Sequence, residues 1–164
     1  MGEAWERGLR GDHASAIELI DEVLKDCPST ILGLRIKGNL LDLKAVDELA
    51  GPIATLVTSR DFLCARACYE QILRLDPQNA PARIDLGDQF KTLRAFDRCL
   101  GYYEQAVDVL ATDEDVESRT KYLGEILDRI SELEVQCSSA KLSEIRKSCN
   151  AILNGGQPGP SGPP

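Results

Sequence analysis

The apolar residues of this chain recur three and four positions apart, which is the spacing of one face of an α-helix. Near the C-terminus they form two stripes in different registers, one of Leu123, Ile126, Ile130, Leu133 and Cys137 and one of Leu142, Ile145, Cys149 and Ile152. Almost no segment alternates with the period of two that marks a half-buried β-strand. The pattern therefore predicts an all-α protein, with separate helices over 113–136 and 139–153.

The tripeptide Tyr-Glu-Gln occurs twice, at 69–71 and at 103–105, and the two copies are 34 residues apart. The apolar neighbours repeat in the same register, as the pairs Phe62 and Phe96, Ala65 and Cys99, Ile72 and Ala106, and Leu75 and Val109. A fixed period of this length indicates stacked pairs of helices, in which each pair covers an apolar surface of the next.

The residues around the second copy follow a known repeat pattern, Trp-x2-Leu-Gly-x2-Tyr followed by Ala-x3-Phe and then Pro. The matching positions are Leu86, Gly87, Phe90 and Tyr103 in this unit, Ala65, Tyr69 and Pro77 in the unit before it, and Ala4, Ala16, Ile20 and Pro28 in a weaker first unit. Arg83, Cys99 and Ala111 depart from the pattern. Over residues 3–111 the chain resembles the tetratricopeptide repeat (TPR) family. The resemblance implies a right-handed α-solenoid of about three helical hairpins, over 1–28, 29–77 and 78–111, with capping helices at its open end.

The middle hairpin carries an insertion. Two repeat positions that are 12 residues apart in the third hairpin are 27 residues apart in the middle one, at Gly38 and Ala65, so 15 residues are extra. They lie within 43–59, a stretch that is too apolar for a flexible linker and that is interrupted by Gly51-Pro52. We expect a longer first helix, followed by a short extra helix that folds onto the repeats.

The formal net charge is −8, and the chain has no run of lysine or arginine. Because binding to phosphate groups needs clustered cations, neither nucleic acid nor an anionic membrane surface is an expected partner. The longest charge-free apolar stretch, over 50–59, has half of the about 20 residues that a membrane span needs, and no secretory leader opens the chain. We expect a cytoplasmic protein with one domain over 1–154 and a disordered tail over 155–164.

The cysteines and the histidine give no sign of a metal site. The six cysteines contain no Cys-x2-Cys pair, and His13 is the only histidine, so reduced thiols and no bound metal are expected. Cys64 and Cys68 are one helical turn apart, which suggests a thiol-regulated module as one hypothesis. His13 follows Asp12, a good helix N-cap, and is interpreted as a solvated residue at a helix start. No phosphate loop, nucleophile elbow or paired-histidine motif occurs, so we expect neither an enzyme nor a cofactor.

The TPR resemblance implies a concave groove, lined by the leading helix of each hairpin, that binds an extended peptide or a helix of a partner protein. Carried over position by position, the groove face consists of Trp5, Leu32, Arg35, Asn39, Asp42, Ile84, Asp88, Lys91, Ser118, Tyr122 and Glu125. The alternative for each residue is a solvated helix face without a ligand. We predict a non-catalytic interaction module or adaptor in which Arg35 and Asn39 contact the partner. Charge reversal at Arg35 together with Asn39→Ala is then expected to weaken binding without unfolding the protein.

One subclass of the family can be tested on the sequence. TPR proteins that hold the C-terminal carboxylate of chaperones carry Lys/Arg-x3-Asn in one leading helix, Asn in the next, and Lys-x3-Arg in the third. Arg35 and Asn39 match the first pair, and Arg119 matches the last position. Asp85 and Asp115 replace the Asn and the Lys, and their charges would repel a carboxylate, so this clamp is disfavoured.

A structural alternative is self-association as a scaffold or homodimer. Two surfaces are candidates: the inserted apolar segment and the two C-terminal stripes, whose spacing is similar to that of short coiled-coil heptads.

Overall fold

The computed structural model describes residues 1–155, and every regular element in this range is a helix. The α-helices are α1 (Gly2–Leu9), α2 (His13–Asp26), α3 (Ile31–Asp47), α4 (Arg60–Leu75), α5 (Ala80–Thr92), α6 (Phe96–Ala111), α7 (Val116–Glu134) and α8 (Ala140–Leu153), and η1 (Ile53–Thr58) is a 3₁₀ helix. The prediction of an all-α protein is confirmed for this part of the chain. Except for Gly155, the tail expected over 155–164 lies outside the described residues.

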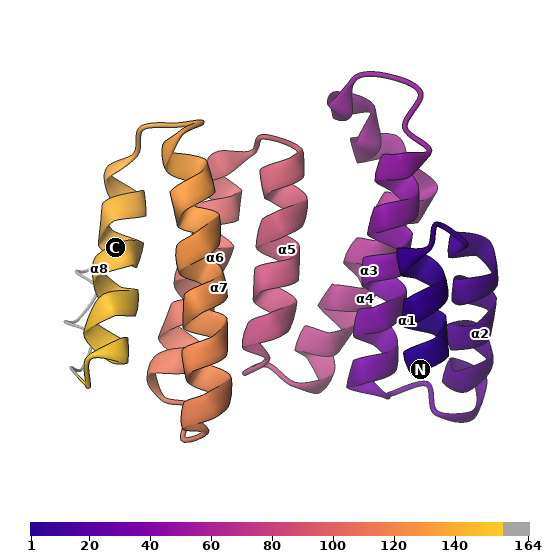
Figure 1. Cartoon of the computed structure of the whole chain (residues 1–164), viewed down its shortest axis with the longest axis horizontal. Coiled ribbons are helices and arrows are strands. Elements are labelled where there is room, and N and C mark those ends of the chain that lie inside the picture. The colour runs from indigo at the N-terminus through magenta and orange to yellow at the C-terminus, as the bar shows by residue number, and fades with distance from the viewer. Residues whose placement is uncertain (156–164) are drawn as a thin grey trace.

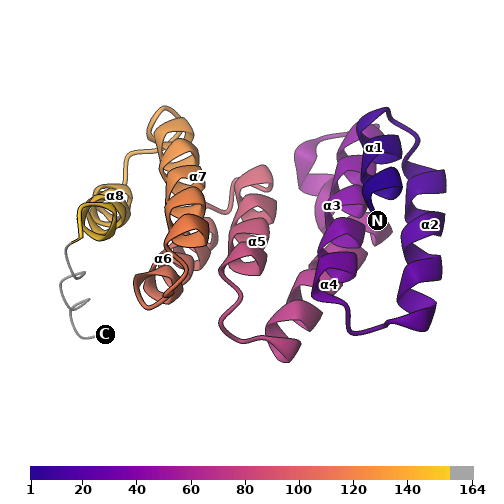
Figure 2. The ribbon, with the colours of Figure 1, turned by 60° about the horizontal axis from the view of Figure 1, so that its bottom comes forward.

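Helices that follow one another in the sequence also pack together. The chain proceeds along its long axis from α1 and α2 at one end to α8 at the other, and a second view gives the same order (Figures 1 and 2). The helix α1 packs against α2, α3 against α4, and α5 against α6, while α7 contacts both α6 and α8. In addition α3 contacts α5, and α5 contacts α7, so helices from successive pairs share one side of the molecule.

The inserted residues form a longer helix and a short one, as expected. The helix α3 continues to Asp47, and η1 follows before α4 begins at Arg60. The end of α3 and η1 project beyond the neighbouring helices (Figure 1). Leu56 of η1 is only 1% exposed and packs with Ala45 and Phe62, so an apolar contact holds η1 on the body of the protein.

Polar residues and prolines determine where several helices begin and end. The helix α4 ends at Leu75, because Asp76 precedes Pro77 and the residue before a proline is pushed out of the α region. Asn79 then caps α5 by accepting a hydrogen bond from the backbone N–H of Ala82.

The helix α7 starts later than the range 113–136 implied. Its N-cap is Asp115, whose carboxylate accepts hydrogen bonds from the backbone N–H groups of Glu117 and Ser118. The sequence prediction is wrong at this end, because Asp115 supplies a negatively charged acceptor at the positive end of the helix.

Two close helix contacts depend on a glycine that faces a tyrosine. A Cβ added at Gly38 in α3 would lie 2.5 Å from the ring of Tyr69 in α4. A Cβ added at Gly87 in α5 would lie 2.4 Å from the ring of Tyr103 in α6. The two tyrosines, which belong to the repeated tripeptide, are at most 1% exposed. The 34-residue repeat therefore corresponds to one helix–helix contact that is made twice.

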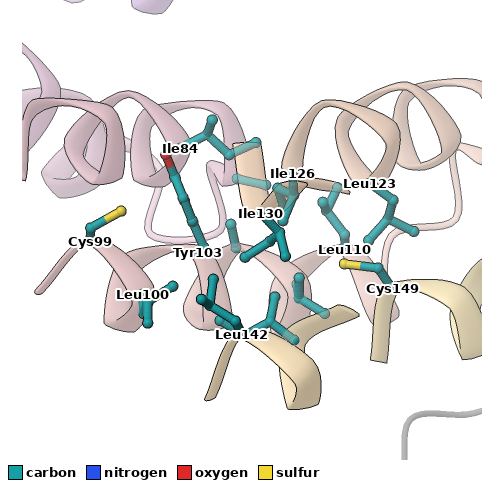
Figure 3. Packing of buried hydrophobic residues seen from close by; sticks show 14 of the residues in the cluster. Ile84, Cys99, Leu100, Tyr103, Leu110, Leu123, Ile126, Ile130, Leu142 and Cys149 are labelled. Carbon is teal, nitrogen blue, oxygen red and sulfur yellow. The ribbon is translucent and has the colours of Figure 1, made fainter. Parts of the chain in front are cut away.

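The two C-terminal stripes point into the protein (Figure 3). They form one apolar cluster with α6 that contains Leu123, Ile126, Ile130, Leu133, Leu142, Ile145, Cys149 and Ile152. Each of these side chains is at most 6% exposed. Their apolar surface is thus used within the chain, so self-association through the stripes would require this cluster to open.

Candidate functional site

The side of the molecule formed by α3, α5 and α7, called the leading-helix face below, carries most of the residues predicted to bind a partner. Its polar side chains contact one another from helix to helix. Arg35 of α3 pairs with Asp85 of α5, with Nε donating to Oδ2 at 2.6 Å and Nη2 donating to Oδ1 at 3.0 Å. Asp85 is 8% exposed, and burial raises its pKa while the Arg35 guanidinium opposes that shift. A bidentate pair of this kind fixes α3 against α5.

A second group of contacts surrounds Asp42 of α3. The hydroxyl of Tyr69, whose ring passes Gly38, lies 2.7 Å from Oδ1 of Asn39 and 2.8 Å from Oδ2 of Asp42. The other carboxylate oxygen of Asp42 accepts a hydrogen bond of 2.6 Å from the amide of Gln89 in α5. These contacts connect α4, α3 and α5 at a single point.

A third group surrounds Asp88 and joins α5 to α7. The hydroxyl of Tyr103 donates to Asp88, and Nε of Arg129 lies 2.8 Å from both oxygens of the same carboxylate. One turn further on, Nζ of Lys91 lies 2.9 Å from Glu132. We call the contacts Arg35–Asp85, Asp42–Gln89, Asp88–Arg129 and Lys91–Glu132 the polar ladder, since they cross the leading-helix face from α3 to α7.

Arg35 also reaches beyond α5 toward α7. Its guanidinium carbon lies 5.9 Å from the centre of the Tyr122 ring, and Nζ of Lys121 lies 5.0 Å from the same ring. Because α3 and α7 both contact α5, the side chain of Arg35 extends across α5 to reach Tyr122.

Few of the predicted residues are left open to a partner. Leu32 is 54% exposed, and Trp5, Ser118, Tyr122 and Glu125 are half-buried. Ile84 is fully buried in the cluster that contains Tyr103, so the prediction that it lines an open groove is wrong. The position of Ile84 in the repeat predicts which helix it belongs to, but it does not predict how deeply the neighbouring helices bury its side chain.

Arg35 and Asn39 are occupied by contacts within the chain. Arg35 is paired with Asp85, and Asn39 accepts from Tyr69. Charge reversal at Arg35 would place a carboxylate against the buried carboxylate of Asp85. Contrary to the prediction from sequence, that change is therefore expected to destabilise the fold.

The same contacts bear on the carboxylate clamp. Asp85 already fills the guanidinium fork of Arg35, and Asp115 caps α7. The Nη1 of Arg119 donates to the backbone carbonyl of Asp113 at 3.0 Å. The clamp stays disfavoured, now because the arginines that match it are engaged within the chain.

The environment of Asp42 predicts a pH dependence of stability. Burial raises the pKa of Asp42 to about 7, although the hydrogen bonds from Gln89 and Tyr69 lower it. Between about pH 4 and pH 7 the folded protein therefore retains a proton that the unfolded chain has lost, and the free energy of unfolding falls as the pH rises. The slope is at most about 1.4 kcal/mol per pH unit for one such group.

Asp42→Asn removes this titration while keeping a neutral polar side chain. Urea unfolding between pH 4 and pH 8 measures the free energy of unfolding of both proteins. We expect this free energy to change less with pH in the variant than in the wild type, and the variant to gain most over the wild type above pH 7. Identical profiles for the two proteins would show that Asp42 is not held in a buried site.

The thiol and histidine hypotheses are changed by burial. Burial raises the pKa of Cys68 to about 11, which leaves little reactive thiolate at neutral pH, whereas Cys64 is exposed. His13 is 8% exposed, and its Nε2 lies 2.8 Å from Oδ2 of Asp47. Its interpretation as a solvated residue is wrong, because α2 packs beside α3, which ends at Asp47.

A comparison with protein-family models finds no match, and neither does a comparison with curated protein sequences. None of the helices within residues 1–155 has both the length and the apolar character needed to cross a bilayer. Function is therefore inferred from the geometry of the chain itself.

Proposed function

We propose that this chain is a TPR-like α-solenoid that acts as a non-catalytic adaptor in the cytoplasm, binding a segment of another protein on the leading-helix face. The observation that supports this proposal is the polar ladder. Three ion pairs and one hydrogen bond connect three helices in series and hold one face in place, and a preformed face binds with a smaller loss of conformational entropy than a mobile one.

The end of this face near the start of α3 and α7 is the proposed contact region. Leu32 lies one turn before Arg35 on the same side of α3, and it is 54% exposed. Tyr122 is half-buried and lies beside Arg35. The exposed leucine and the tyrosine held by two cations both lie close to Arg35. They are suited to apolar side chains of the partner, since aromatic residues with a fixed orientation are frequent at binding hot spots.

Leu32→Arg tests this region without touching the polar ladder. We expect the variant to remain folded by circular dichroism and to bind the partner at least about tenfold more weakly than the wild type. Affinity capture from a cell extract should identify a protein retained by the wild type, and titration of that purified protein should then measure the affinities.

Leu75→Arg is the matched control, because Leu75 is a similarly exposed leucine (46%) at the end of α4. The control is expected to bind like the wild type. Equal binding by Leu32→Arg and the wild type would rule out the contact region.

Self-association is a second candidate function, supported by the projecting insertion. Five large apolar side chains on it and its neighbouring turns are at least 37% exposed: Leu43, Val46, Ile53, Val57 and Leu63. Large apolar side chains that gather on a protein surface are typical of an interaction site, and these five are the candidates for one. Sedimentation at micromolar concentration separates the two candidates, since a monomer would leave only the leading-helix face.

A further inference from the structure

A second surface, formed by α4, α5 and α6, brings together two cations and two aromatic rings. Phe90 and Tyr102 stack with their ring centres 5.5 Å apart and their planes 8° from parallel. The guanidinium carbon of Arg66 lies 4.9 Å from the centre of the Phe90 ring, and that of Arg98 lies 5.4 Å from it. The two positive charges are therefore directed to the same ring from different helices.

Neither of these arginines has a carboxylate oxygen within 4.0 Å among residues 1–155. Nε of Arg66 donates to the amide oxygen of Gln89 at 3.2 Å, and its Nη2 is buried without a hydrogen-bond partner in the described chain. The charge of Arg66 lowers the pKa of Asp42, but the two groups form no ion pair. The chain holds 27 acidic residues against 19 lysines and arginines, so acidic groups are not scarce. Two like charges thus face one ring, and neither forms an ion pair within residues 1–155.

The surface beside this cluster is hollow. The hollow is lined by Phe90, Arg98, Gly101, Tyr102 and Gln105. A Cβ placed on Gly101 would meet no atom within 4 Å, so the wall at this residue is open. Gln105 adds an amide that can donate or accept a hydrogen bond. The hollow therefore offers a cation, a neutral polar group and the exposed part of an aromatic stack.

We propose that this hollow, called the arginine–aromatic site below, binds an acidic side chain of a partner protein, an aspartate or glutamate that is flanked by an apolar residue. The carboxylate pairs with Arg98, with Arg66 adding to the positive potential, and the apolar neighbour lies against Tyr102. A carboxylate matches the planar fork of an arginine and forms two parallel hydrogen bonds with it. A polyanion such as RNA fits less well, because the net charge of −8 repels every phosphate outside the hollow.

The test uses two short peptides on the whole chain, acetyl-Leu-Glu-Leu-amide and its neutral counterpart acetyl-Leu-Gln-Leu-amide. Each is added to millimolar concentration while NMR follows the side-chain Nε–H signals of Arg66 and Arg98 and the backbone amide of Gly101. The glutamate peptide is expected to move these signals, and the effect is expected to weaken as salt is added. The glutamine peptide is expected to leave them in place.

Variants show whether the peptide binds at the arginine–aromatic site. Arg98→Gln is expected to weaken binding by about tenfold or more, the effect of losing the charged hydrogen bonds that this arginine forms with the carboxylate. Gly101→Phe fills the hollow and is expected to abolish binding. Two matched controls are expected to bind like the wild type. Gly124→Phe changes a glycine of α7 that also has no atom within 4 Å of an added Cβ. Arg74→Gln changes an exposed arginine of α4.

Three results would overturn the proposal: no movement with the glutamate peptide, equal movement with both peptides, or unchanged binding to Gly101→Phe. If inorganic phosphate or an RNA oligonucleotide moved the same signals while the glutamate peptide did not, the carboxylate assignment would be wrong. The arginine–aromatic site lies apart from Leu32 and Tyr122, so its failure would leave the leading-helix face untouched.

Discussion

Arg35→Glu is expected to lower the free energy of unfolding by about 3–5 kcal/mol, the usual cost of leaving one partner of a buried ion pair uncompensated. The side chain of Asp85 is only 8% exposed, so water cannot replace the lost guanidinium. The new carboxylate would add repulsion next to it. Urea unfolding monitored by circular dichroism measures the change.

The matched control is the double variant Arg35→Met with Asp85→Leu, which removes both charges and keeps apolar volume. It is expected to be close to the wild type in stability, because replacing a complete buried pair is often neutral. A loss below about 1 kcal/mol for Arg35→Glu, which is typical of an exposed ion pair, would contradict the buried contact between α3 and α5. The expected destabilisation by Arg35→Glu explains why Leu32, and not Arg35, is suited to a binding test.

Tyr103→Ala is expected to cost about 3–5 kcal/mol, because it empties a fully buried aromatic position between α5 and α6. Gly87→Ala is expected to cost about 1–3 kcal/mol, since the added Cβ would lie 2.4 Å from the ring of Tyr103 and must displace it. Thermal and urea unfolding of the single variants gives both values.

Two controls isolate the contact between the glycine and the ring. Gly101→Ala, in α6 with no atom within 4 Å of the new Cβ, is expected to stabilise the protein by about 0.5–1 kcal/mol through helix propensity. In the background of Tyr103→Ala, the change Gly87→Ala is expected to lose its cost, because the ring is gone. An additive result for the double variant would show that Gly87 does not face Tyr103.

The sequence was sufficient to predict features that depend on local spacing. The apolar segment within 43–59 lengthens α3 and adds the short helix η1 on the body, as expected. The repeated Tyr-Glu-Gln predicted that Tyr69 and Tyr103 have equivalent environments. Such features depend on a residue and on its neighbours within about one helical turn, so a short stretch of sequence is enough to predict them.

Features that depend on contacts between distant residues were not predictable from the spacing. Arg35 and Asp85 are 50 residues apart, and their pairing depends on how closely α3 approaches α5. The position of Ile84 within its repeat gives no measure of how deeply α6 and α7 bury it. His13 was misjudged for the same reason, since its partner Asp47 is 34 residues away. The sequence carries one sign of this pairing, the placement of opposite charges at neighbouring leading-helix positions, as with Arg35 and Asp85.

The central claim is that α3, α5 and α7 form one face that Arg35 bridges. A nuclear Overhauser spectrum of the whole chain tests it most directly, through the pair formed by the Arg35 side-chain Nε–H and the Tyr122 ring. We predict a cross-peak between them, because the guanidinium carbon lies 5.9 Å from the ring centre. Absence of that cross-peak, in a spectrum where the Tyr103 ring still shows its contact with Gly87, would mean that the helix pairs form but that Arg35 does not bridge α3 and α7.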